Sequence, residues 1–333
     1  MTRALLARRG LAGLMIIAAA TAVVACGPAP APQGGAPSGQ AAQSAGFPRT
    51  VKHAMGETTV PAAPKRVAAL DASFVDAAIA LEAEVVAFTS YRSIGDTVPA
   101  YLGEPGKRLS AGAKAVGPLA APKIELILNQ KPDLILSAKV RHEQIYGQLS
   151  AKVPTVFSDT TGPTWKENIR LVGRALGKED LAEKKIKDYE DRARRIGDAI
   201  RAKEGRNPTV SIVRFVDGPT RLYQQASFSG IVMKDAGLAR PPAQAANSFA
   251  AEISEERISD ADADKIFVAT YPDEKGASAS TRQRFETNPL WRPLAGKAVE
   301  VEDLTWVTAV SLQGAHIILD DLAKAFGVDP AKS

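Results

Sequence analysis

The chain has 333 residues, of which 45% are hydrophobic and 24% are charged. This balance is typical of globular proteins and excludes a wholly disordered chain, a collagen and a coiled-coil fibre. The formal net charge is +5. Three of the 42 Lys and Arg residues, Arg3, Arg8 and Arg9, lie in a segment that we expect to be removed, which leaves 39 cations against 37 anions. Proteins that bind nucleic acid usually carry a larger basic excess, so we expect no nucleic-acid partner.

Residues 1–25 are predicted to be an export signal. Residues 10–25 form an uncharged, mostly apolar run behind the arginines, and this run is shorter than the ~20 residues that a membrane span needs. The run ends in Val-Val-Ala before Cys26, the only cysteine of the chain. This sequence resembles the lipobox of bacterial lipoproteins, which implies that Cys26 is acylated and becomes the N-terminus. We therefore expect an exported protein anchored by lipid to the outer face of the cytoplasmic membrane. The alternative is a plain signal peptide with an incidental cysteine.

Residues 26–47 are predicted to be a flexible tether. From Gly27 to Gly46 the chain contains only Gly, Pro, Ala, Gln and Ser. Such a segment cannot bury a hydrophobic core. The globular part therefore follows the tether.

Residues 48–178 are predicted to form an N-terminal lobe in which strands and helices alternate. The expected strands are Val67–Leu70, Val85–Phe88, Leu134–Leu136 and Val153–Phe157. The expected helices are one capped by Ser73 and running to Leu81, then Ile124–Asn129 and Trp165–Leu176. This alternation predicts a parallel sheet that helices cover on both faces.

A single long helix is predicted at residues 179–204, ahead of a C-terminal lobe at residues 205–333. The helix carries a narrow apolar stripe, which fits either an ordinary surface helix or a strut that lies against two lobes. In the C-terminal lobe the expected strands are Thr209–Val216, Lys265–Thr270 and Ala298–Val301, and the expected helices are Phe228–Ala236 and Thr308–Phe326. The predicted fold is thus α/β, with two lobes that are each a parallel sheet flanked by helices, joined by one long helix.

Several ordered sequence blocks carry a resemblance to a known family. They include Pro64-Lys65-Arg66-Val67, Glu125 followed by Lys131-Pro132-Asp133-Leu134-Ile135, Arg214-Phe215, and Ile253-Ser254-Glu255-Glu256. Over residues 50–327 the chain resembles the iron-siderophore substrate-binding proteins of ABC importers, a class with vitamin B12- and haem-binding relatives. The resemblance implies two lobes joined by a helix, a ligand in the cleft between them, and delivery of that ligand to an ABC permease. We expect a monomer.

Candidate ligand-binding residues follow from the rule that ligands sit beyond the carboxyl ends of parallel strands. They are Tyr91, Arg92, Arg141, Arg214, Arg221, Tyr223, Tyr271 and Trp306. Guanidinium groups bind pairs of anionic oxygens, and aromatic rings stack on planar groups. Together with the resemblance, this chemistry predicts a ferric siderophore as ligand and no cofactor, because the siderophore itself would hold the iron. The alternatives are solvated loop charges and packed aromatic rings.

The resemblance assigns a different role to Glu125 and Glu256. In the family, glutamates at these places on the lobe surfaces pair with arginines of the permease. The alternative is that both are solvated carboxylates near helix starts, where negative charge is favoured.

Haem and vitamin B12 are the nearest alternative ligands. Haem needs axial ligands, for which His142 with Tyr91 is the best placed pair. Vitamin B12 would need fewer arginines. Direct binding of Mn or Zn would need several His and carboxylate ligands in one cleft, and these are scarce. An exported hydrolase would carry a Gly-x-Ser-x-Gly elbow, which is absent, as are dinucleotide- and phosphate-binding loops, so we expect no enzyme. An adhesion protein would not require the Arg and aromatic set at the strand ends.

Overall fold

The computed structural model describes residues 46–332. The predicted export signal, Cys26 and all but the last residues of the predicted tether lie outside this range. The described residues, 46–332, belong to one compact unit. None of the described helices is long and apolar enough to cross a membrane.

The N-terminal lobe is built on a five-stranded sheet of order β5-β4-β3-β6-β7, in which all neighbours are parallel. Its strands are β3 Val67–Ala69, β4 Val85–Ser90, β5 Lys114–Pro118, β6 Leu134–Ala138 and β7 Thr155–Ser158. Its helices are α1 Ala72–Ala80, α2 Gly103–Leu109, α3 Ile124–Asn129, α4 Lys139–His142, α5 Tyr146–Ser150 and α6 Trp165–Leu176. The central strands are buried along their whole length, as expected of a parallel sheet covered on both faces. An antiparallel hairpin, β1 Arg49–His53 and β2 Gly56–Val60, was not expected from the sequence.

The start of α1 differs from the prediction. Asp71, not Ser73, is the N-cap, and its carboxylate accepts hydrogen bonds from the Ser73 backbone N–H at 3.0 Å and the Ser73 hydroxyl at 2.7 Å. Asp is as good a cap as Ser, and the earlier cap lets the helix begin directly after strand β3. This places the Asp71 carboxylate at the carboxyl edge of the sheet.

The C-terminal lobe is built on a mixed five-stranded sheet of order β10-β9-β8-β11-β12. Its strands are β8 Val210–Phe215, β9 Thr220–Tyr223, β10 Ala250–Ile253, β11 Lys265–Thr270 and β12 Ala298–Glu300, and its helices are α8 Phe228–Asp235 and α9 Ala277–Thr287. Strands β8, β11 and β12 pair in parallel, whereas β9 pairs antiparallel with both of its neighbours, β8 and β10. The expectation of a wholly parallel second sheet is therefore wrong at β9 and β10, because a short turn after β8 returns the chain as a hairpin instead of through a helix.

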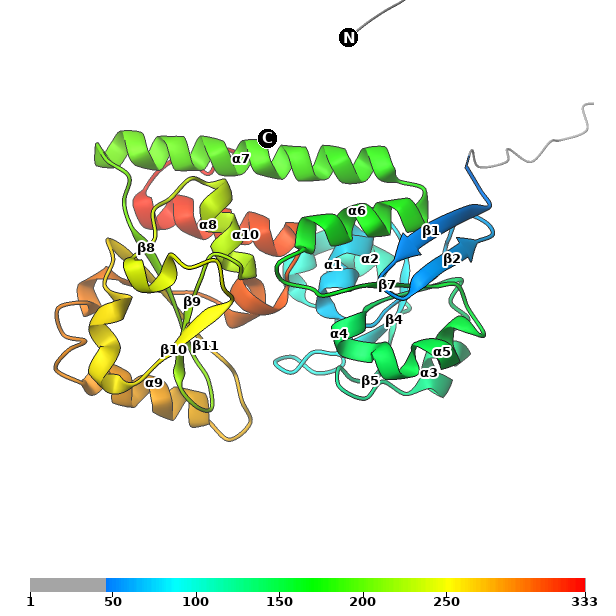
Figure 1. Ribbon diagram of the computed structural model, residues 1–333, viewed down its shortest axis with the longest axis horizontal. Coiled ribbons are helices and arrows are strands. Elements are labelled where there is room, and N and C mark those ends of the chain that lie inside the picture. Colours follow the sequence, from blue (N-terminus) through cyan, green and yellow to red (C-terminus); the bar gives the residue numbers. More distant parts are fainter. Residues whose placement is uncertain (1–45, 333) are drawn as a thin grey trace, which may run out of the picture. The chain divides into compact units, whose positions relative to one another are not determined.

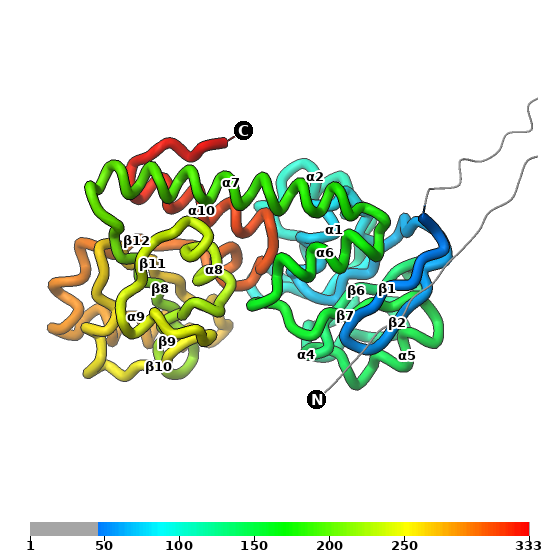
Figure 2. Tube along the Cα trace, turned by 45° about the horizontal axis from the view of Figure 1, so that its top comes forward, coloured from blue at the N-terminus to red at the C-terminus, as the bar shows by residue number. Residues whose placement is uncertain are grey.

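Helix α7, Glu179–Glu204, runs past elements of both lobes (Figure 1). It packs on α6 of the N-terminal lobe and on the closing helix α10, Leu312–Phe326. The C-terminal segment returns along α7 (Figure 2), where the Arg192 guanidinium donates to the Pro330 carbonyl at 2.9 Å. At Gly197 the helix meets α8 so closely that a Cβ atom would lie 1.7 Å from the Ala236 carbonyl oxygen. Contacts on α6, α8 and α10 make α7 the strut between two lobes.

Helix α10 begins at Leu312, four residues later than predicted. Leu304–Thr308 forms a π-helical turn instead, and Val310 has a φ of 46°, in a region that β-branched residues avoid. The N-terminus of α10 is met by a side chain of the other lobe. The carboxylate of Asp76 on α1 accepts hydrogen bonds from the backbone N–H groups of Gln313 at 3.3 Å and Gly314 at 3.4 Å. The carboxyl group of Asp76 thus faces the positive end of a helix across the lobe junction.

Burial raises the pKa of Asp76 to about 7, although hydrogen bonds from Gln313, Ser311, Gly314 and Tyr101 act in the opposite direction. Between pH 4 and 7 the folded protein therefore holds a proton at Asp76 that the unfolded chain releases, so this group's contribution to stability falls as pH rises through that range. Asn cannot ionise, so the unfolding free energy of Asp76→Asn should not fall in this way. We therefore expect the unfolding free energy of Asp76→Asn minus that of the parent to rise by up to about 4 kcal/mol from pH 4 to pH 8. Urea denaturation at the two pH values measures this gain. An equal difference at both values would contradict the assignment.

Candidate ligand-binding cleft

A cavity of about 530 Å³ lies between the two lobes, within the size range of small-molecule sites. Every strand of the N-terminal sheet contributes to it at or just beyond its carboxyl end: Asp71 after β3, Tyr91 after β4, Leu119 after β5, Arg141 after β6 and Thr160 after β7. The carboxyl-end rule therefore locates this wall of the cleft correctly.

The other wall is organised by Arg214, whose side chain is mostly buried. Its Nε and Nη2 atoms donate to the two carboxylate oxygens of Asp303 at 2.5 and 2.9 Å, and its Nη1 donates to the Tyr223 hydroxyl at 3.0 Å. The guanidinium also lies 5.2 Å from the centre of the Tyr271 ring. Burial acts to lower the pKa of Arg214, but Tyr223 and Asp303 outweigh it and raise the pKa above its usual value. Two of the five N–H donors remain for a ligand, on a group that is already fixed in place.

Arg214 and Arg221 are direct cross-strand partners in the β8–β9 pair, and both line the cleft. Two like charges at such positions destabilise a sheet unless counter-charges offset them. Asp303 neutralises Arg214, and the Nε of Arg221 donates to Glu252 on β10 at 3.4 Å. The sequence predicted Arg214 near the end of a strand, as observed, but Arg221 in the loop that follows; the structure places Arg221 on strand β9, which runs back antiparallel to β8.

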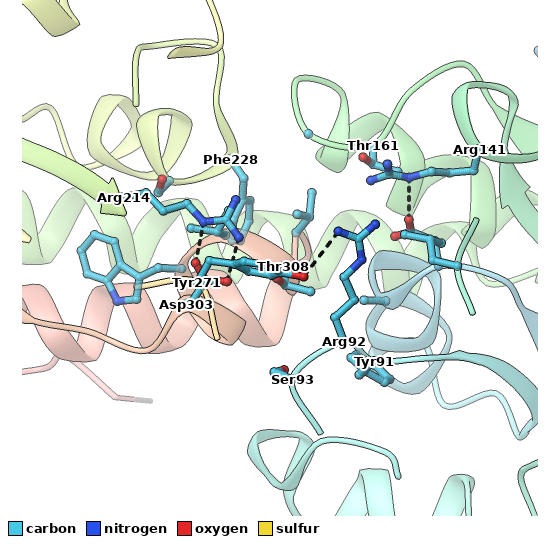
Figure 3. A pocket seen from close by; sticks show the side chains of 18 of the residues that line it. Tyr91, Arg92, Ser93, Arg141, Thr161, Arg214, Phe228, Tyr271, Asp303 and Thr308 are labelled. Atoms are coloured by element: carbon cyan, nitrogen blue, oxygen red, sulfur yellow. Dashed lines mark hydrogen bonds and ion pairs between the residues drawn. The ribbon is translucent and has the colours of Figure 1, made fainter. Parts of the chain in front are cut away.

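Two arginines of the N-terminal lobe face this wall (Figure 3). Arg92, which is exposed, reaches across the cleft, and its Nη1 donates to the Tyr271 hydroxyl at 3.4 Å. Arg141 donates through Nε to the buried carboxylate of Asp71 at 3.0 Å. The cleft is thus lined by four arginines and two aspartates, which gives its walls a net charge of +2.

The aromatic candidates are not equivalent. Tyr271 is half-buried and borders the open space, whereas Tyr223 is buried and serves Arg214. Tyr91 is also buried, and burial together with the charges of Asp76 and Asp71 raises the pKa of its hydroxyl well above the usual value. Trp306 borders the cleft but is fully buried, stacked on Phe267 at 4.6 Å and donating through Nε1 to Asp321 at 2.8 Å. The Trp306 ring therefore packs in the core, which was the alternative to stacking on a ligand.

Sequence reasoning missed several cleft residues. Asp71 and Asp303 follow strands β3 and β12 closely, so the carboxyl-end rule could have found both. Val140 and Phe249 line the cleft although 61% and 49% of their surfaces are exposed. Phe249 precedes the antiparallel strand β10, which the sequence pattern did not reveal.

The structure removes the histidine on which the haem alternative depended. His142 is buried outside the cleft, with Nδ1 2.6 Å from the Ser137 hydroxyl and Nε2 2.7 Å from the Leu119 carbonyl oxygen. Its pKa is lowered, chiefly by burial. His53 and His316 do not line the cleft either. In residues 46–332 no group of three His, Cys, Asp or Glu side chains could hold a metal ion.

The two predicted docking glutamates are exposed and lie far apart in the chain. Glu125 is in the first turn of α3, and Glu256 is in the first turn of a 3₁₀ segment, Glu255–Ala261. A hydrogen bond from the Ser254 hydroxyl, and one within the helix start itself, lower the pKa of Glu256. Both side chains are exposed, so a partner could reach them.

Comparisons with known proteins agree with this architecture. The profile of the periplasmic binding protein family matches residues 67–302. The chain is 36% identical to the "Probable siderophore-binding lipoprotein YfiY" of Bacillus subtilis, over 84% of this chain and 87% of that protein. It is 26% identical to the Fe(3+)-citrate-binding protein YfmC of the same organism, over 83% and 85% of the two chains. The crystal structure of Staphylococcus aureus SirA complexed with staphyloferrin B superposes with a TM-score of 0.74 at 28% identity, covering 85% of this chain and 99% of that one.

The matched region contains both sheets and the strut α7, and it covers more than half of the chain. The chain therefore belongs to the periplasmic binding protein family. The family profile, a relative that is similar over most of its length and the two lobes joined by a helix all support this assignment.

Proposed function

We propose that this protein captures a ferric siderophore in the cleft between its lobes and delivers it to an ABC permease for iron uptake. The observation that carries the proposal is the lining of the cleft, where two arginines from each lobe surround the space and the walls have a net charge of +2. Ferric siderophores are commonly anionic and present oxygen edges to their surroundings, which suits rigid guanidinium donors. The relatives named for siderophore and ferric citrate binding support this choice of ligand.

We infer a binding role and not a catalytic one. No histidine, lysine, cysteine or glutamate lines the cleft in the described part of the chain. The two carboxylates that do line it, Asp71 and Asp303, are held by Arg141 and Arg214. The cleft hydroxyl groups therefore have no free general base beside them.

We also propose that the protein is a lipid-anchored monomer of the cell envelope. The proposal rests on the sequence around Cys26 and on the lipoprotein name of a relative that is similar over most of its length. We propose, as part of the same picture, that the chain is divided as predicted into an export signal, a tether, two lobes and a linking helix.

A ligand titration of the full chain tests the proposed function. We expect a ferric siderophore to quench tryptophan fluorescence saturably, because Trp306 borders the cleft. Arg92→Ala should weaken binding about 10- to 100-fold, since one hydrogen bond to a charged group contributes about 1.5–3 kcal/mol. Arg108→Ala removes an exposed arginine of α2 and is the matched control. Equal affinities for the parent and Arg92→Ala would show that Arg92 does not contact the ligand. Saturation by haem alone would refute the proposal that the ligand is a ferric siderophore.

We further propose that Glu125 and Glu256 dock the loaded protein on its permease. Exposed charge pairs chiefly guide encounter and orientation. Replacing both by Arg should lower ferric siderophore uptake by cells at least tenfold and leave the affinity of the isolated protein for its ligand unchanged. Glu104→Arg on α2 reverses another exposed carboxylate and should not affect uptake. Normal uptake by the double variant would refute the docking role.

A further inference from the structure

The carboxyl group of Asp76 lies at the lobe junction, just behind the lining of the cleft. Asp76 itself is fully buried and does not line the cleft. Cleft-lining residues lie near it on both sides of the junction. Asp71 caps the same helix, α1, and Val310 directly precedes Ser311, whose hydroxyl acts on the pKa of Asp76. The ionisable group is therefore close to the cleft without being part of its lining.

Tyr91 indicates that a charge on Asp76 is felt at the cleft wall. Tyr91 lines the cleft directly after β4. Burial is the largest cause that raises the pKa of its hydroxyl, and the negative charge of Asp76 is the next. Like charges repel more strongly in buried surroundings than in water. An anion bound beside Tyr91 would therefore meet the same repulsion from an ionised Asp76.

Within the described chain, the groups that act most strongly on Asp76 carry no positive charge. They are the hydrogen-bond donors Gln313, Ser311, Gly314 and Tyr101. Helix α1 packs on β3, β4, α2, α6 and α10, and the two strands contain no ionisable side chain. The Asp71 carboxylate ahead of α1 is paired with Arg141. The charged side chains of the three helices are exposed or contact α7 or Trp306: the exposed ones are Glu104, Lys107, Arg108, Glu167, Arg174 and Lys324, and the others are Lys166, Arg170, His316, Asp320 and Asp321.

We propose, on the basis of the proposed function, that Asp76 makes ligand capture sensitive to pH, because the cleft binds an anionic ferric complex more tightly when Asp76 is protonated than when it is ionised. The cleft walls carry a net charge of +2, and ionisation of Asp76 places one negative charge behind them. By linkage, a bound anion favours the protonated carboxyl, so binding near neutral pH takes up protons. The pKa of Asp76 without ligand is about 7. The affinity for the complex should therefore fall as the pH rises from 6 to 8.

Fluorescence titrations of the full chain at pH 6 and pH 8 test the inference on the parent and on Asp76→Asn. The probes are three anionic complexes, ferric dicitrate, ferric staphyloferrin B and a ferric triscatecholate, and one uncharged ferric trihydroxamate. Asn is uncharged at both pH values, and both proteins bind the same complex, so the ratio of their dissociation constants cancels any titration of the complex itself. For an anionic probe, we expect the dissociation constant of the parent divided by that of Asp76→Asn to rise about three- to tenfold from pH 6 to pH 8.

The outcomes separate this inference from the proposed function. A ratio that is constant or falls with pH would overturn the inference and leave the proposed function in place. Binding of the uncharged trihydroxamate alone would do the same, because the cleft would then not select an anion. No binding of any probe at either pH would overturn both.

Asp235→Asn is the matched control. Asp235 is another largely buried carboxyl at the lobe junction, and burial also raises its pKa, but it is paired with Lys166 and does not line the cleft. This variant should keep the pH dependence of the parent. If Asp235→Asn lost that dependence as Asp76→Asn does, the effect would not belong to Asp76, and the inference would be overturned.

Calorimetry of the parent alone gives a second measurement that needs no variant. Binding at pH 7 is measured in two buffers of different ionisation enthalpy, with an anionic probe whose own charge is constant between pH 6 and pH 8. We expect an uptake of about 0.3–0.4 protons per ligand, the value that a three- to tenfold change in affinity implies at pH 7. Release of protons, or no exchange, would overturn the inference even if Asp76→Asn did not fold.

Discussion

The structure depends on one continuous apolar core that passes from lobe to lobe beneath helix α7. Buried side chains of the same cluster come from α1 (Phe74), α6 (Val172), α7 (Tyr189), α8 (Val232) and α10 (Leu319). Moving the lobes apart would expose this surface to water, at about 25 cal/mol for each Å². Polar contacts reinforce the same junction, since Lys166 of α6 bridges Glu190 of α7 and Asp235 of α8 at 2.7 and 3.0 Å. The cleft on the opposite side of the junction is therefore largely preformed.

A preformed cleft explains how its charges are held. Arg214 and Arg141 are each paired with a buried aspartate, so their orientation is set before a ligand arrives and little side-chain entropy is lost on binding. Arg92 and Arg221 make only long hydrogen bonds of 3.4 Å, to Tyr271 and Glu252, and can turn toward a ligand at small cost. The walls thus combine fixed donors with adaptable ones. Such a division suits recognition of a bulky anion without enclosing it in a moving lid.

The sequence predicts the N-terminal half of the site better than the C-terminal half, for a physical reason. Parallel strands joined by helices all end at one edge, so Tyr91, Arg92 and Arg141 could be placed there from the alternation of elements alone. The hairpin β8–β9 breaks that alternation, and Arg214, Arg221 and Tyr223 lie on strands although they reach the same cleft. The sequence pattern also could not predict which aromatic side chains are buried. Whether a ring such as that of Trp306 faces a ligand or the core depends on packing across the lobes. The long helix was predictable from its apolar stripe, but the stripe fitted an ordinary surface helix as well as a strut, and the expectation that it joins two lobes rested on the family resemblance.

The most direct test of this account is the position of the iron in a crystal of the protein grown with its ferric ligand. Anomalous diffraction at the iron absorption edge locates the metal without reference to the chelator. We expect one iron in the cleft between Arg92 and Arg214, coordinated by ligand oxygens alone, with α7 unbent and the lobes close to their present arrangement. An iron coordinated by protein side chains, or bound outside the cleft, would contradict it.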